Sequence, residues 1–166
     1  VVVHIDAHTD TYRGDGNQDY MRFNVATTFT RAAEESLIDV EASIHVGARG
    51  PTSDSGVFNH TRDVGFGLID STELFNAGLR NTAKNIVESL KGRSVYLCFD
   101  MDFFDPSCAP GVCTPTWGGA TSREGLDFLQ NLTGLNLVGA DINTVSPPHD
   151  ISGMTAFLAA TVGLEI

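Results

Sequence analysis

The stretch Val1–Asp10, VVVHIDAHTD, indicates the fold class of this protein. Its first half, Val1–Ile5, is a short apolar run rich in β-branched residues. Continuous runs of this kind are typical of strands that are covered on both faces of a parallel sheet. Its second half places Asp6, His8 and Asp10 directly after that run. A buried strand is therefore expected to lead straight into a polar cluster.

Runs of the same kind recur along the chain and alternate with helical patterns. Strands are predicted at Ala42–Val46, Gly67–Ile69, Ser94–Phe99 and Leu137–Ile142. Helices are predicted at Ala26–Leu37, Ser71–Leu90, Ser122–Leu132 and Ser152–Val162. Strands that alternate with helices predict an α/β fold with right-handed crossovers. Gly50–Phe58 and Phe103–Ala120 are long and rich in Gly and Pro, and we expect functional loops there.

Length and composition narrow the class of protein. The 166 residues suit a single domain with a buried core, and 42% hydrophobic with 19% charged residues argues against a disordered chain. The net charge of −11 disfavours nucleic acids and anionic membranes as partners and favours a cationic ligand. No apolar run reaches the roughly 18–20 residues of a membrane span. The three cysteines lack a C-x-x-C spacing and no secretory signal is visible, so we expect a reducing, cytoplasmic compartment.

Acidic clusters follow two of the predicted strands. Asp6, His8 and Asp10 follow the first strand, and Asp100 and Asp102 follow the fourth. In open α/β sheets, ligands bind at the carboxyl ends of the strands. Because residues i, i+2 and i+4 of an extended segment share a side, each cluster is expected to converge. A loop cap or a solvated turn is the alternative interpretation of either cluster alone.

The two clusters together predict a metal site. Four carboxylates and one imidazole in a half-buried crevice would repel one another unless cations neutralise them. Such a donor set favours hard or borderline divalent ions, and Mn²⁺ suits it well. Two groups of ligands suggest two ions, and a water shared by metals about 3.5–4 Å apart becomes a nucleophile at neutral pH.

The same residues carry a resemblance to a known family. His4–Asp10 (HIDAHTD) resembles the D-A-H-x-D signature of the ureohydrolases, which include arginase and agmatinase. Phe99–Gly111 (FDMDFFDPSCAPG) resembles the family's second signature, and His45–Gly50 (HVGARG) is similar to its I-G-x-R-G segment. Ser146–Asp150 (SPPHD) resembles the agmatinase-like branch. The resemblance covers the whole chain in order.

The resemblance implies a three-layer α/β/α sandwich around a mainly parallel sheet and a site for two manganese ions, with nickel as an alternative metal. It implies that Asp6 and Asp100 bridge the two ions and hold the hydroxide that attacks a guanidinium carbon. Asp10 would bind one ion only, and His8 and Asp102 would bind the other.

The resemblance also bears on completeness and assembly. The family's first metal ligand, a His in a G-G-D-H motif, has no counterpart in this sequence, and the chain starts within a strand without an initiator Met. We therefore expect residues 1–166 to be part of one catalytic domain that is truncated at its N-terminus, with an incomplete site for one ion. Family members are typically trimers or hexamers, which implies a homo-oligomer. Asp105 is expected to orient its loop rather than to bind metal.

Two positions depart from the family pattern. Where many members have H-G-T-x-F, with a His that transfers protons, this chain has Val25–Phe29 (VATTF). Where many have D-x-x-E-V-S-P, Thr144 replaces the Glu that meets the guanidinium, and its hydroxyl supplies no charge. Both changes predict altered substrate recognition. His149 and Trp117 are further candidate substrate-binding residues, Trp117 through its aromatic face, unless it only packs its loop.

Other side chains near the motifs have less specific interpretations. His45 lies within a predicted strand and is expected to be a satisfied core residue. Cys98 is also expected in the core. His4 shares a side with Asp6 if the strand is regular, and its role is left open.

The leading functional hypothesis is an agmatinase-like ureohydrolase that converts agmatine and water to putrescine and urea, a step of polyamine metabolism. Guanidinobutyrate and guanidine are the alternative substrates. A non-catalytic, metal-binding partner subunit of the same fold is a second hypothesis, because of the changes at Val25 and Thr144. A deacetylase of the same general fold is a third, but the His-rich motif of its mononuclear zinc site is not found in the sequence.

Overall fold

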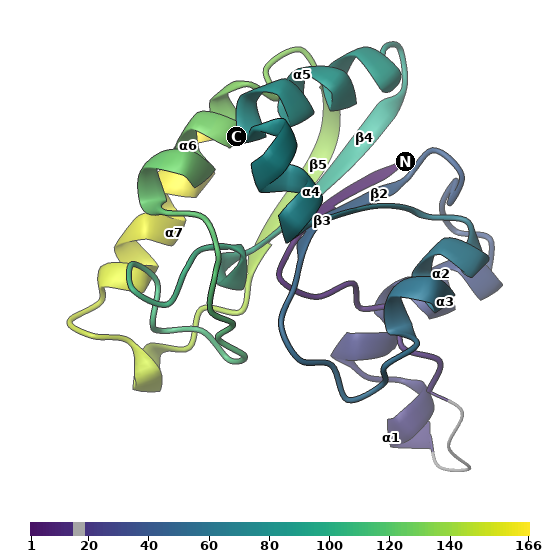
Figure 1. Ribbon diagram of the computed structural model, residues 1–166, viewed down its shortest axis with the longest axis horizontal. Coiled ribbons are helices and arrows are strands. Elements are labelled where there is room, and N and C mark those ends of the chain that lie inside the picture. Colours follow the sequence, from purple (N-terminus) through teal and green to yellow (C-terminus); the bar gives the residue numbers. More distant parts are fainter. Residues whose placement is uncertain (15–18) are drawn as a thin grey trace.

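The computed structural model describes residues 1–14 and 19–166 (Figure 1). Within them the strands are β1 Val2–Ile5, β2 Ile44–Ala48, β3 Gly67–Asp70, β4 Ser94–Asp100 and β5 Asn136–Asn143. The α-helices are α1 Asp19–Arg22, α2 Thr28–Glu34, α3 Val57–Val64, α4 Ser71–Ala77, α5 Leu79–Ser89, α6 Ser122–Gln130 and α7 Met154–Glu165. Short 3₁₀ helices lie at η1 Val25–Thr27, η2 Met101–Phe103 and η3 Pro147–His149. None of these helices has the length and apolar character needed to cross a bilayer.

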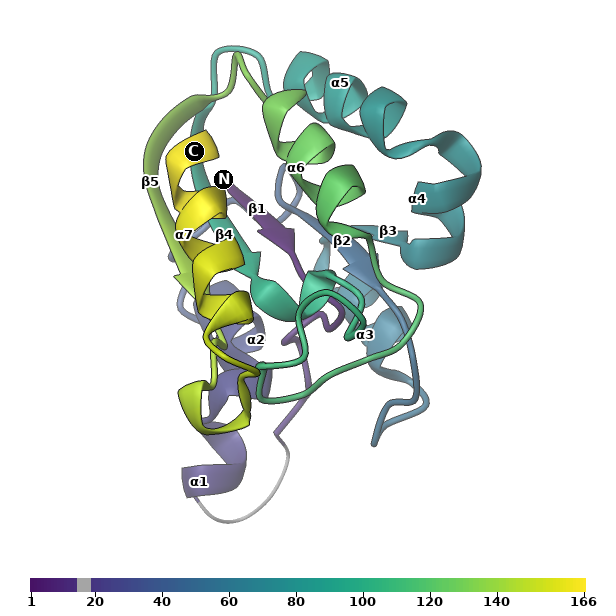
Figure 2. The ribbon, with the colours of Figure 1, turned by 90° about the vertical axis from the view of Figure 1, so that its left-hand side faces the viewer.

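The strands form one parallel sheet in the order β3-β2-β1-β4-β5. Helices α4 to α7 lie on one side of the sheet, and α2 and α3 lie on the other (Figures 1 and 2). The predicted α/β class, parallel sheet and three layers are therefore confirmed. β1 is central and buried along its whole length, because helices cover both faces and strands flank both edges.

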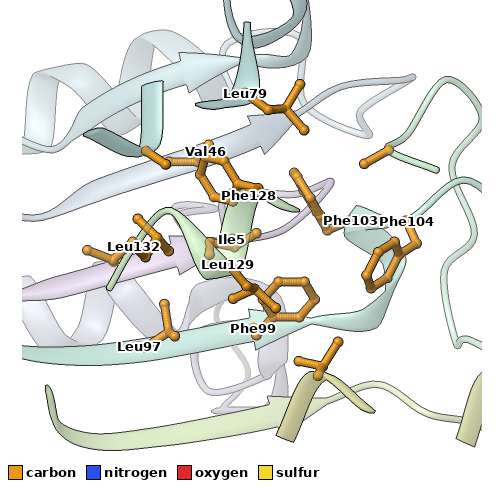
Figure 3. Packing of buried hydrophobic residues seen from close by; sticks show 14 of the residues in the cluster. Ile5, Val46, Leu79, Leu97, Phe99, Phe103, Phe104, Phe128, Leu129 and Leu132 are labelled. Atoms are coloured by element: carbon orange, nitrogen blue, oxygen red, sulfur yellow. The ribbon is translucent and has the colours of Figure 1, made fainter. Parts of the chain in front are cut away.

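The main core fills the space between the sheet and helices α4 to α7 (Figure 3). Phe103 packs between Phe99 and Phe128, with ring centroids 5.8 Å and 6.0 Å away, and Phe104 lies 5.6 Å from Phe99. All four rings are almost fully buried. Aromatic pairs at these separations stabilise beyond the area they bury, by about 0.5–1.5 kcal/mol each. Because Phe103 and Phe104 follow β4 directly, the core also anchors the segment that carries the second acidic cluster.

The opposite face of the sheet carries a smaller core. It consists of Val2, Phe29, Phe66 and Cys98, with partly buried residues of the α2 and α3 regions packed against it. This face is where β1 and β2 direct two histidine side chains that are described below.

Several predicted boundaries are wrong. The helix predicted over Ser71–Leu90 is two helices, since Gly78 has a φ of +83° and its N–H ends α4 on the carbonyl of Leu74. Helix α3 begins at Val57, within the loop predicted at Gly50–Phe58, and no helix was predicted there. The N-cap of α6 is Thr121, in a reciprocal pair with Glu124. The other predicted helices differ at their ends, which is where sequence patterns are least informative.

Candidate metal centre

The register of the central strands brings the two acidic clusters together. Ile5 of β1 lies opposite Phe99 of β4, so Asp6 and Asp100 leave the same edge of the sheet side by side. Their side chains are only 2% and 3% exposed. The carboxyl ends of parallel strands are where such sheets bind ligands, as predicted.

Two overlapping groups of ligand atoms result. Oxygen and nitrogen atoms of Asp6, His8 and Asp102 lie within 4.8 Å of one another, and so do those of His4, Asp6 and Asp10. Asp100 lines a cavity, described below, together with Asp6, His8 and Asp10. The five residues predicted as metal ligands thus lie in one place. His4, whose role the sequence left open, lies with them.

The cause of this convergence differs from the predicted one. β1 ends at Ile5, Asp10 has a φ of +50°, and Asp102 lies in η2, so neither cluster is an extended strand end. Instead, each leading carboxylate accepts a hydrogen bond from the backbone N–H two residues further on. These bonds join His8 N to Asp6 Oδ1 at 2.5 Å and Asp102 N to Asp100 Oδ1 at 2.7 Å. Aspartate turns of this type fold the clusters back on themselves.

Hydrogen bonds also tie the second cluster to the first. Asp102 Oδ1 accepts from the N–H of Ala7 at 3.0 Å, and its Oδ2 lies 3.0 Å from His8 Nδ1. The Thr114 hydroxyl donates to Asp102 Oδ2 at 3.1 Å. The Thr144 hydroxyl donates to Asp100.

The centre holds more carboxylates than imidazoles, and the pKa values of these groups are shifted. Burial first, and then the charge of Asp6, raise the pKa of Asp100 to about 10 and that of Asp10 to about 7. Hydrogen bonds to Asp102 and Asp6 raise the pKa of His8 to about 11. Burial opposes the ionisation of Asp6, but neighbouring histidines outweigh it and keep its pKa below the usual range.

These pKa shifts indicate whether the residues fit metal ions. Crowded carboxylates whose pKa values rise to neutrality and above need additional positive charge before all of them can ionise. Divalent cations supply that charge, and oxygen donors with one or two imidazoles suit the harder and borderline ions. The residues present therefore fit the metal ions that the resemblance implies.

A cavity of about 720 Å³ opens above the cluster, a size that suits a small molecule. Asp6, His8, Asp10 and Asp100 line it together with Thr144. Its remaining lining includes Tyr12, Val25, Ala26, Phe29, Cys113, Thr114 and Asn143.

Two predicted substrate-binding residues lie elsewhere. Trp117 and His149 are not among the residues that line this cavity, in the part of the chain that the structure describes. Trp117 is 74% exposed, and His149 pairs through Nδ1 with the hydroxyl of Ser146 at 2.7 Å. Their assignment to the substrate stays a prediction.

One wall of the cavity was missed by the sequence reasoning. Asn143 donates to Asp141 Oδ1 at 2.8 Å, and the Cys98 thiol lies 3.3 Å from both of these side chains. Burial first, and then Asp141, raise the pKa of the Cys98 thiol, so it stays protonated. Cys98 is buried as predicted, yet it also lines the cavity. The available signal was the spacing of Asp141 and Asn143, which share one face at the end of a strand.

The long loop after β4 is anchored by two charged residues. The guanidinium of buried Arg49 donates to the carbonyls of Asp102 at 2.7 Å and Thr116 at 2.8 Å. The carboxylate of Asp105 accepts from backbone N–H groups at Ser107, Gly118 and Gly119. Asp105 therefore orients the loop, as expected.

Comparison with known proteins adds an independent finding. The family model described as "Arginase family" matches residues 1–166. A guanidinobutyrase of Pseudomonas aeruginosa is 35% identical over 99% of this chain and 51% of its own length. An agmatinase of Neisseria meningitidis is 36% identical over 99% of this chain and 50% of its own. The solved proclavaminate amidino hydrolase of Streptomyces clavuligerus is 36% identical with a TM-score of 0.89, covering 99% of this chain and 53% of its own. The chain thus spans about half the length of the relatives it matches.

Proposed function

The chain belongs to the arginase family, and on this premise we propose that the full-length protein hydrolyses the C–N bond of a small guanidino compound. Agmatine is the first candidate substrate, with putrescine and urea as products. The observation that carries the proposal is the buried cluster of four carboxylates and an imidazole at the base of a cavity. The names of the related guanidinobutyrase and agmatinase support this substrate class.

The proposal assigns two Mn²⁺ ions to the centre, with Ni²⁺ as an alternative. Asp6 and Asp100 would contact both ions, Asp10 one of them, and His8 and Asp102 the other. When bound, such ions activate water at neutral pH and stabilise developing negative charge.

The chain's own residues would orient the substrate. The cavity wall at Asp141 brings a carboxylate to attract a guanidinium cation, and Val25 and Phe29 bring apolar surface for a short methylene chain. Thr144 already donates its hydroxyl to Asp100, so it holds a carboxylate rather than charge-pairing with substrate. This arrangement keeps guanidinobutyrate and guanidine as alternative substrates.

Urea release from the full-length protein tests the proposal. Protein supplied with Mn²⁺ or Ni²⁺ should release urea from at least one of agmatine, guanidinobutyrate and guanidine. Asp100→Asn should abolish this release. Asp127→Asn, which changes an exposed carboxylate in α6, should leave the release unchanged. Absence of urea with every compound and both metals would contradict the proposal.

A non-catalytic partner subunit is the second candidate. Val25 and Thr144 favour it, because these two lining residues supply neither the imidazole nor the carboxylate that the resemblance implies at their positions. Under this alternative, the full-length protein would bind metal and assemble with a partner, yet Asp100→Asn would leave the partner's activity intact. A homotrimer or homohexamer and a cytoplasmic location remain proposals, to be tested by light scattering and by fractionation.

A further inference from the structure

Two buried histidines lie in a row that leads to Asp6, and neither is among the described residues that line the cavity. His4 of β1 and His45 of β2 occupy paired positions in adjacent strands, and each side chain is only 1% exposed. Their Nδ1 atoms lie 2.8 Å apart. At this distance a single proton lies between them, so one ring donates and the other accepts.

Two phenyl rings pack against the two histidine rings. The His4 ring centroid lies 4.5 Å from that of Phe29, and the His45 ring centroid lies 4.7 Å from that of Phe66. Neither phenyl ring offers a conventional hydrogen-bond partner. The Nε2 atom of His45 has no hydrogen-bond partner among the described residues. The inter-strand contact to His4 is therefore the polar interaction that sets the orientation of the His45 ring, and the reverse contact restrains His4.

His4 in turn contacts the carboxylate at the centre of the site. Its Nε2 atom lies 2.9 Å from Asp6 Oδ2, the distance of an ion pair, but not in the geometry of a regular hydrogen bond. The other oxygen, Asp6 Oδ1, accepts a hydrogen bond from the backbone N–H of His8 at 2.5 Å. The same oxygen lies 3.2 Å from His8 Nδ1. Asp6 is thus held from two sides, by the β1 strand behind it and by the turn in front of it.

We propose that His45 is a positioning residue for the metal centre: it fixes the ring of His4, and His4 fixes the carboxylate of Asp6 in the orientation that binds metal. Partners behind a ligand commonly set its orientation, and their loss typically lowers metal affinity about 10- to 100-fold. The inference rests on the metal site of the proposed function but not on which guanidino compound is hydrolysed. Neither histidine needs to touch a metal ion or a substrate in this role.

The test measures Mn²⁺ affinity of the full-length protein by calorimetric titration, independently of activity. His45→Phe keeps a ring in the aromatic surroundings but removes the contact to His4, and the dissociation constant should rise about tenfold or more. His45→Gln offers a replacement amide to His4 and should recover most of the affinity. Phe66→Leu is the matched control, because it removes packing against His45 without removing a hydrogen bond. It should lower the melting temperature and leave the Mn²⁺ affinity unchanged.

The outcomes separate this inference from the proposed function. An unchanged dissociation constant in His45→Phe would overturn the positioning role. If affinity falls in His45→Phe and recovers in His45→Gln but no compound yields urea, the positioning role stands and the proposed function fails. If the variants do not fold, the contact between His4 and His45 can still be tested in the unsubstituted protein. With ¹⁵N-labelled histidine, a coupling between the two Nδ1 atoms across the shared proton is expected, and its absence would contradict the inference.

Discussion

At the scale of single residues, threonine hydroxyls support the carboxylates of the metal centre. Thr114 donates to Asp102 and Thr144 donates to Asp100. Thr144 has a φ of +64°, a region that β-branched residues rarely adopt. Strained conformations of this kind persist where the surroundings enforce them, often at functional sites. At the position where the resemblance implies a Glu in many members, this chain has a residue that contacts a candidate metal ligand.

Removing the Thr144 hydroxyl should weaken metal binding. Thr144→Val keeps the shape and the branched Cβ but leaves Asp100 without this donor, so Mn²⁺ affinity should fall by about tenfold. Thr144→Ser keeps the hydroxyl and should bind Mn²⁺ nearly as well as the unsubstituted protein. Titration of both variants with Mn²⁺ checks this. Equal affinities of Thr144→Val and the unsubstituted protein would contradict it.

Arg49 should be required for the stability of the loop after β4. Its planar guanidinium donates to several buried carbonyls, including Asp102 and Thr116, and a Lys ammonium does not match that geometry. Arg49→Lys leaves buried acceptors unsatisfied, so the free energy of unfolding should fall by about 1–3 kcal/mol. Urea denaturation measures the change. Arg80→Lys, at an exposed pair with Asp127, should alter stability very little.

At the scale of elements, strand register decides where the chemistry is. The pairing of Ile5 with Phe99 sets Asp6 beside Asp100, and the pairing of Cys98 with Asp141 builds one wall of the cavity. A shift by one residue would turn these side chains to the other face of the sheet. The helices serve this arrangement by covering both faces and anchoring the strands.

The break between α4 and α5 should depend on Gly78. A Cβ there would make an ordinary van der Waals contact, with the nearest atom 3.8 Å away on Asn81, so the backbone conformation alone determines the cost. Gly78→Ala should destabilise the protein by about 1–3 kcal/mol, because a φ of +83° with a ψ of 127° lies in a region that residues with a side chain rarely adopt. Thermal unfolding measures the loss. Asn76→Ala, at an exposed position inside α4, is the control and should leave stability equal or slightly higher.

At the scale of the whole molecule, the metal centre joins segments that are distant in sequence. The clusters after β1 and β4 meet the loop at Thr114 and the end of β5 at Thr144. Repulsion between buried carboxylates therefore opposes folding of the whole domain unless it is neutralised. This couples metal binding to global stability.

Metal should raise the melting temperature of the full-length protein in a concentration-dependent way. At Mn²⁺ concentrations about 100 times the dissociation constant, the stabilisation should be about 2.7 kcal/mol. A chelator should reverse the shift, and Asp100→Asn should greatly reduce it. Scanning calorimetry with and without metal checks this, and identical melting temperatures would contradict the coupling.

The sequence by itself determined the strands and the chemistry at their ends. Apolar runs such as Val1–Ile5 and Ser94–Phe99 stand out because hydrophobic burial acts on local patterns. The two acidic motifs were recognisable because each lies within a few neighbouring residues. Five candidate ligands and the family could therefore be predicted from the chain alone.

Only the tertiary structure decided how those residues are held. The contact of His4 with His45 spans 41 residues, and that of Thr144 with Asp100 spans 44. No local pattern encodes such pairs, because they depend on strand order, register and the packing of both faces. The turn at Asp10 belongs to the same class, because Asp adopts a positive φ more readily than most residues but only the folded surroundings select it at this position.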